Sequence, residues 1–138
     1  MVFEQLTNDY ENDAGQLSPL NLAFVGDAVY TMLVRTKLVV MANRPAHILN
    51  KLASGKVCAV SQSTEYYRLL PHLNENELMI LKRGRNANPT HKAKNASAAQ
   101  YRNATGLEAL FGYLYLKGEN SRILELFNIC WGDAKDGK

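Results

Sequence analysis

Hydrophobic residues recur along most of this chain at the three-to-four-residue spacing of amphipathic helices. Ser18 followed by Pro19 predicts the start of a long first helix that runs to Val40, because a serine oxygen caps free N–H groups and proline fits the first helical turn. Further helical runs are predicted at residues 45–52, 57–70, 74–81, 97–117 and 120–131. No run alternates long enough to predict a strand. The pattern therefore predicts a single all-α domain of about six to seven helices.

A few polar residues and glycines predict where the helices end. Asn74 with Glu77 three residues later predicts a capping box, and Gly118 suits the end of the helix at 97–117. Gly84 and the segment 86–89 interrupt the helical spacing, so residues 82–94 are predicted to form a mobile basic loop. Gly112 would let another helix come close to its own.

Two acidic residues interrupt the apolar faces of the two longest predicted helices. On a helical wheel, Asp27 shares a side with Leu20, Ala23, Thr31, Val34 and Leu38, and Glu108 with Tyr101, Ala104, Thr105, Phe111, Gly112 and Tyr115. Burying an unpaired carboxylate costs several kcal/mol, so each acid must be protonated, hydrogen-bonded, paired or metal-bound. Mg²⁺ takes one or two protein carboxylates and keeps its other positions for water and phosphate oxygens. Asp27 and Glu108 are candidate Mg²⁺ ligands; the alternative is two structural acids satisfied by helix N–H groups or a base such as Arg35.

The net charge of +3 is modest, but the charges are segregated along the chain. Residues 1–34 contain no Lys or Arg, whereas residues 78–107 contain six Lys or Arg and no Asp or Glu. The cations are Lys82, Arg83, Arg85, Lys92, Lys94 and Arg102. A basic strip with a separate acidic site is what a phosphate-backbone ligand and a divalent cation require. The alternative is a solvated run of basic residues without a ligand.

Composition limits the class of protein further. A chain of 138 residues, 46% of them hydrophobic, fits one domain with its own core. Cys58 and Cys130 have no zinc-type spacing and are too few for a disulfide framework, so we expect core thiols in a cytoplasmic protein. Charged residues interrupt the longest apolar stretch, and no signal peptide is evident, so no membrane association is expected.

Two motifs resemble those of a known enzyme family. The run LNLAFVGDAVY resembles the signature of the ribonuclease III endonuclease domain, and TGLEALFGYLYL resembles the second acidic motif of that domain. Between them, LKRGRNA and YRNATGLEAL are similar to the compact subgroup called Mini-ribonuclease III, which lacks the double-stranded RNA-binding domain. The resemblance covers residues 17–117 as a catalytic core and leaves 118–138 as a C-terminal helix and tail.

The resemblance implies metal-assisted phosphodiester hydrolysis of double-stranded RNA, with Mg²⁺ held by Asp27 and Glu108. Ala23 and Thr105 stand where the larger family carries two further acids. The implied products have 5′-phosphate and 3′-hydroxyl ends, and the implied substrate is the precursor of 23S ribosomal RNA. The six cations of the basic strip would contact the RNA backbone, which a protein binds without a sequence code.

The sequence leaves two alternative functions open and favours a dimeric assembly. A non-catalytic double-stranded RNA-binding or ribosome-associated module would not need the two acids, and a helical interaction protein would leave the charge segregation unexplained. Cutting both strands of a duplex in one encounter needs two sites related by a two-fold axis, so we expect a homodimer. Part of the first helix, with Val25, Val29 and Met32 on the side away from Asp27, is expected to form its interface.

Overall fold

The computed structural model describes Leu6, residues 13–87 and residues 96–131. These residues form six α-helices and two short 3₁₀ turns, and contain no strand. The helices are α2 (Pro19–Met41), α3 (Ala46–Val57), α4 (Ala59–Leu69), α5 (Glu75–Asn86), α6 (Ala98–Leu116) and α7 (Asn120–Trp131), with 3₁₀ turns η1 (Ala14–Gln16) and η2 (Leu70–His72). The all-α prediction is confirmed.

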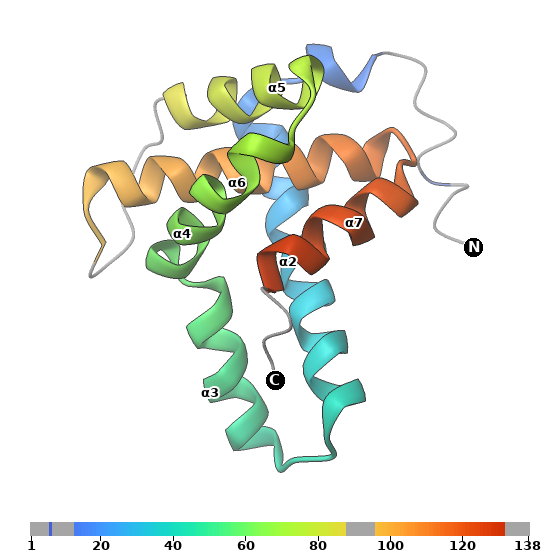
Figure 1. The fold of residues 1–138 in the computed structure, drawn as a ribbon, viewed down its shortest axis with the longest axis vertical. Helices are drawn as coiled ribbons and strands as arrows, with labels where there is room; N and C mark the ends of the chain where they lie inside the picture. Colours follow the sequence, from blue (N-terminus) through green and yellow to red (C-terminus); the bar gives the residue numbers. More distant parts are fainter. Residues whose placement is uncertain (1–5, 7–12, 88–95, 132–138) are drawn as a thin grey trace.

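Helix α6 is the centre of the fold, and α2, α4, α5 and α7 pack around it (Figure 1). These helices cover α6 so fully that every residue from Asn103 to Leu114 is buried except Glu108, which is partly exposed. The core includes an edge-to-face ring contact between Tyr30 of α2 and Phe111 of α6, with centroids 5.2 Å apart. One acid therefore interrupts an otherwise fully buried helical segment.

Two glycines let α2 and α6 cross with their backbones in contact. A Cβ on Gly26 would overlap the backbone oxygen of Glu108, and a Cβ on Gly112 would overlap the backbone oxygen of Leu22. Neither position could hold a larger residue without moving a helix, since backbone atoms cannot rotate out of the way. The close approach predicted for Gly112 is confirmed.

The predicted helix boundaries are correct where a local hydrogen bond sets them. The Ser18 side chain accepts from the Asn21 N–H at 3.3 Å and caps α2. Asn74 and Glu77 form the predicted reciprocal capping box of α5. Gly118 ends α6 with a positive φ of 75°, a conformation that glycine adopts without steric cost.

The predicted basic loop is wrong in its first part, because α5 continues to Asn86 and includes Lys82, Arg83 and Arg85. Gly84 does not break the helix. A Cβ there would lie 2.8 Å from the Cβ of Ala109, so this glycine allows α5 to pack closely on α6. Gly84 therefore lies at a close contact between two helices and not in a turn.

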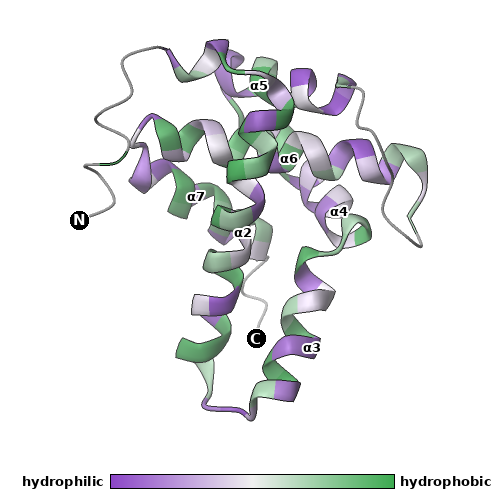
Figure 2. Cartoon of the chain, turned by 180° about the vertical axis from the view of Figure 1, so that it is seen from behind, coloured by the Kyte–Doolittle hydropathy of each residue, from purple (hydrophilic) through white to green (hydrophobic). Residues whose placement is uncertain are grey.

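The C-terminal half of α2 and the whole of α3 project from the rest of the molecule as a two-helix arm (Figure 1). We call this hairpin, residues 35–57, the arm. Hydrophobic and hydrophilic segments alternate along both of its helices (Figure 2). Cys58 lies exposed at the end of α3 while Cys130 is buried, so the predicted core location is confirmed only for Cys130. None of the described helices is both long and apolar enough to cross a lipid bilayer.

Candidate active site

The crossing of α2 and α6 brings Asp27 and Glu108 together. Asp27 directly follows Gly26, and Gly26 packs against the backbone of Glu108 itself. The two carboxyl groups are close enough for the charge of Asp27 to raise the pKa of Glu108. A pair of acids distant in sequence thus forms one site at a backbone contact that only glycine permits.

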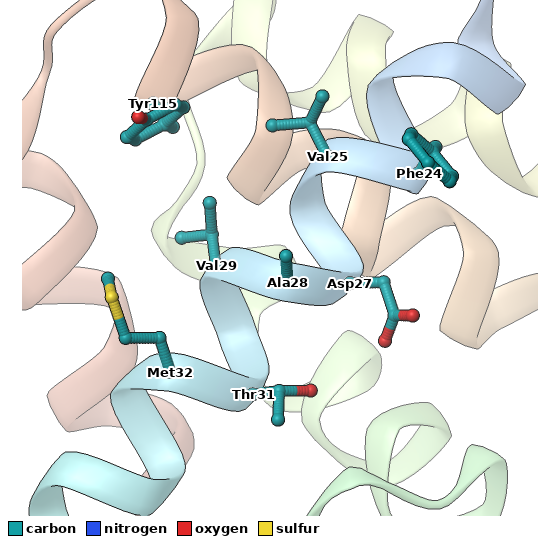
Figure 3. A pocket seen from close by; sticks show the side chains of 8 residues that line it. All are labelled: Phe24, Val25, Asp27, Ala28, Val29, Thr31, Met32 and Tyr115. Carbon is teal, nitrogen blue, oxygen red and sulfur yellow. The ribbon is translucent and has the colours of Figure 1, made fainter. Parts of the chain in front are cut away.

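Asp27 is exposed, so the prediction that it lies on the buried face of α2 is wrong. The buried face is formed by Leu22, Gly26, Val29 and others, with Gly26 at the α6 contact. A wheel based on hydrophobic side chains cannot recognise a glycine as the centre of a packed face. Figure 3 shows Asp27 and Thr31 pointing to one side of α2 and Val29 and Met32 to the other. The Asp27 carboxylate is therefore accessible to a ligand.

Glu108 is the less accessible member of the pair. Burial raises its pKa to about 8, and the neighbouring negative charge of Asp27 contributes in the same direction. The side-chain amide of Gln62 acts in the opposite sense and favours the ionised carboxylate. A buried carboxyl group whose ionisation is disfavoured by a carboxylate beside it is a typical arrangement for a shared proton or a shared cation.

Gln62 lies at the site, although no feature of the sequence indicates it. It belongs to α4, is 2% exposed, and faces the Glu108 carboxyl group closely enough to affect its ionisation. Its buried Nε2 forms no direct hydrogen bond within the described part of the chain. A single glutamine in a helical run carries no motif, so only the packing of α4 on α6 could identify it.

Ala23 and Thr105, the positions at which the larger ribonuclease III family carries two further acids, are both buried. The Thr105 hydroxyl donates to the backbone oxygen of Tyr101 at 3.1 Å, so it is satisfied inside α6. Among the residues that the structure describes, no three His, Cys, Asp or Glu side chains cluster as a metal site. Two carboxylates match what Mg²⁺ requires when water and phosphate oxygens complete its coordination, so the donor set fits that ion.

The ionisation of Glu108 should make the stability of the metal-free protein depend on pH. The folded chain holds the Glu108 proton up to about pH 8, whereas the unfolded chain releases it near the ordinary value of 4.5. Between these values the unfolded state binds fewer protons, so this residue lowers stability as pH rises. The Gln side chain of the Glu108→Gln variant cannot ionise. We expect the Tm of this variant minus the Tm of wild type, both measured in EDTA, to be roughly 5 °C larger at pH 8.5 than at pH 5.

Asp27→Asn provides the matched comparison for this measurement. It removes the neighbouring charge but keeps the buried Glu108, so it should give a smaller effect of the same sign. A Tm difference between Glu108→Gln and wild type that is the same at both pH values would contradict the environment described for Glu108.

Two arginines of the basic strip hold helices together. The Arg83 guanidinium donates to the backbone oxygens of Gly15 and Leu17, at 2.6 Å and 3.3 Å, and ties the η1 segment to α5. Arg85 donates from Nε to the Asn103 side-chain oxygen at 2.9 Å. These side chains have structural partners already, which limits the donors they can offer to a ligand.

The other members of the strip differ in what the structure describes. Lys82 is exposed on α5 and Arg102 is partly exposed near the start of α6. Lys92 and Lys94 lie outside the described residues. The RNA-contacting role of all six cations remains a prediction.

Comparison with known proteins shows the family. Residues 20–119 match the family model described as the ribonuclease III domain. The chain belongs to the ribonuclease III domain family. Mini-ribonuclease 3 of Brevibacillus brevis is 44% identical over 126 residues, which cover 91% of both chains. Mini-ribonuclease 3 of Thermoanaerobacter sp. is 43% identical over 113 residues, covering 82% of this chain and 80% of the relative.

A solved structure shares the fold of this chain. A crystal structure of a protein from Fusobacterium nucleatum has a TM-score of 0.77 and 32% identity to this chain. The similarity covers 86% of this chain and 95% of that protein. The resemblance of the two acidic motifs to the ribonuclease III family is therefore confirmed, and with it the expectation of an endoribonuclease.

Proposed function

We propose that this protein is a Mg²⁺-dependent endoribonuclease of the cytoplasm that cleaves double-stranded RNA and matures the ends of the 23S ribosomal RNA precursor. The observation that carries the proposal is the apposition of Asp27 and Glu108 at the glycine crossing of α2 and α6. Similarity to Mini-ribonuclease 3 proteins over most of the chain supports the substrate class. The exposed Asp27 supports access of a large ligand to the site.

Asp27 and Glu108 would hold the cation. When bound, Mg²⁺ polarises a phosphate oxygen and lowers the pKa of a coordinated water for attack on the phosphodiester. The chain's own residues prepare this chemistry. Glu108 gives up its proton to become a ligand, and the Gln62 amide favours that ionised form. Hydrolysis with the outcome typical of the family would leave a 5′-phosphate on one product and a 3′-hydroxyl on the other.

The basic residues would bind the duplex through its backbone, because proteins recognise A-form RNA mainly by phosphates, 2′-hydroxyls and groove shape. Lys82 and Arg102 offer the accessible charges among the described members of the strip. Arg83 and Arg85 support this surface through their structural hydrogen bonds. Lys92 and Lys94 complete the proposed set.

One experiment separates the enzyme from the binding module. Purified protein is incubated with long double-stranded RNA, with either Mg²⁺ or EDTA, and both complex formation and fragment length are followed. The enzyme binds in both conditions and cuts only with Mg²⁺. Binding without cleavage in Mg²⁺ would favour the non-catalytic module, and absence of binding would favour a helical interaction protein. Single-stranded RNA of the same sequence serves as the control substrate.

An apolar surface on the outer side of α2 supports the proposed homodimer. A cavity of about 610 Å³ opens there, lined by Val25, Val29 and Met32 and, from α6, by Tyr115, with Asp27 and Thr31 also among its lining residues (Figure 3). Phe24 at its edge is 82% exposed and Met32 is 48% exposed. An exposed phenylalanine beside an apolar cavity is unfavourable in water. Exposed apolar patches of this kind usually mark sites of interaction with another molecule.

The occupant we propose for this cavity is Phe24 of a second copy. A two-fold interface uses the same patch on both chains, so the patch must be self-complementary. A projecting side chain and a neighbouring cavity within one patch meet that condition. Val29 is already buried within its own chain, which leaves Phe24, Val25 and Met32 as the apolar contacts.

Replacing Phe24 by Glu should convert the dimer to a monomer, because it removes the projecting ring and places a charge in the apolar cavity. We expect the dimer dissociation constant to rise roughly 30-fold or more, measured by sedimentation at micromolar concentration. Leu124→Glu is the control, since Leu124 is 54% exposed on α7 and does not line this cavity. A dimer that survives Phe24→Glu unchanged would overturn this interface.

A further inference from the structure

The arm carries a second set of cations, separate from the basic strip. Between Asp27 and Glu65 the sequence contains no acid and five Lys or Arg residues. They are Arg35, Lys37, Arg44, Lys51 and Lys56. No part of the proposed function uses them, although the arm grows directly out of the helix that carries Asp27.

Two of these cations contact Trp131, the last residue of α7. Lys37 lies 5.7 Å and Lys56 lies 4.5 Å from the centre of the Trp131 ring, in cation–π contacts. Arg44 is partly buried near the tip. Arg35 and Lys51 are exposed, and neither forms a hydrogen bond or ion pair with the described residues. These two charges are available to a ligand.

Arg35 differs from Lys51 because it lies on the same side of α2 as the active-site acid. Asp27, Thr31 and Arg35 are spaced four residues apart, so they follow one face of the helix. Figure 3 shows Asp27 and Thr31 pointing to the same side. Eight residues of helix place Arg35 about 12 Å along the axis from Asp27.

Arg35 also lines a cleft between the two helices of the arm. The cleft has a volume of about 170 Å³ and is lined by Arg35, Leu38 and Val39 of α2 and by Leu49 and Asn50 of α3, among others. This equals roughly five or six water molecules at ~30 Å³ each, which suits a phosphate with part of its ribose. Asn50 is exposed and lines the same cleft, where its amide is an uncharged donor.

From these observations we infer that the cleft between α2 and α3, with Arg35 and Asn50, binds a backbone phosphate of the RNA strand that lies at Asp27. The inference rests on the proposed function, since a duplex held at Asp27 must continue past one end of the site. A guanidinium binds phosphate through paired N–H donors, and no acid within the arm competes for it. The arm is then a guide for the substrate strand.

The test compares three single variants in duplex RNA binding, measured in EDTA over a range of salt concentrations. Arg35→Ala should lower affinity roughly 5- to 10-fold and reduce the slope of log K against log salt by about 0.7 to 0.9, because one phosphate contact is lost. Asn50→Ala should lower affinity while leaving the slope unchanged, since it removes a donor without charge. Lys51→Ala is the matched control on the same arm, and its affinity should stay within about twofold.

Each outcome decides the inference. Equal losses for Arg35→Ala and Lys51→Ala would show a diffuse attraction to the arm and overturn the cleft as a site, as would an Arg35→Ala protein with unchanged affinity and slope. If wild type binds and cuts duplex RNA in Mg²⁺ while Arg35→Ala matches it, only this inference fails. If wild type neither binds nor cuts, the proposed function fails as well. Thermal melting of each variant confirms that it is folded.

Discussion

Asp27→Asn and Glu108→Gln are each expected to abolish cleavage of double-stranded RNA while leaving RNA binding within about twofold of wild type. Each change removes one of the two carboxylates available for the cation, and within the described ranges no third acid, His or Cys clusters with them to replace the lost ligand. The rate of cleavage should fall roughly 1000-fold or more, which corresponds to ~4 kcal/mol of transition-state stabilisation. Gel-based cleavage of a labelled duplex measures the rate.

Binding and cleavage must be measured on the same preparations. The backbone contacts come from other residues, so the duplex affinity of both variants in EDTA should stay close to that of wild type. Glu119→Gln is the control, because it removes an exposed carboxylate beyond the end of α6 and should cut normally. Substantial cleavage by either active-site variant in Mg²⁺ would refute the assignment of this pair.

The helices were predictable where their signals are local. Ser18 and the Asn74–Glu77 pair mark helix starts because their side chains bond to backbone N–H groups only a few residues away. Such bonds form in any fold that contains the helix. The same reasoning failed at Gly84, where a residue that usually interrupts helices sits inside one, since its meaning depends on α6 packing against it.

The two acids of the site were predictable, but their setting was not. A wheel treats Asp27 as surrounded by apolar neighbours, whereas the packed face is turned toward Gly26 and leaves the carboxylate exposed. Gln62 reaches Glu108 only because α4 packs on α6, and Arg35 lines a cleft only because α3 folds beside α2. Contacts between distant segments leave no periodic trace in the sequence, so the structure was needed to find them.

Gly26→Ala should be among the most damaging single changes in this chain. The added Cβ would overlap the backbone oxygen of Glu108 and lie 2.8 Å from the backbone nitrogen of Gly112. No rotamer change relieves a clash with backbone, so α2 and α6 must separate and lose part of the core contact between them. We expect the free energy of unfolding to fall by ~3 kcal/mol or more, measured by urea denaturation.

Gly55→Ala is the matched control, because Gly55 lies within α3 and a Cβ there would meet no atom within 4 Å. Alanine favours a helix over glycine, so this change should raise stability by about 0.5–1 kcal/mol. Gly112→Ala should repeat the loss seen for Gly26→Ala, since its Cβ would strike the α2 backbone from the other side. Equal stabilities for Gly26→Ala and Gly55→Ala would rule out the close crossing.

The crossing also sets the distance between Asp27 and Glu108, so Gly26→Ala should reduce cleavage even in protein that remains folded. Activity is therefore measured well below the midpoint of unfolding, with the folded fraction known from the denaturation curve. A rate per folded molecule that falls at least tenfold, with duplex binding retained, is the result expected if the glycine contact positions the two carboxylates. A normal rate per folded molecule would mean that the site tolerates separation of the helices, and that the glycines serve packing alone.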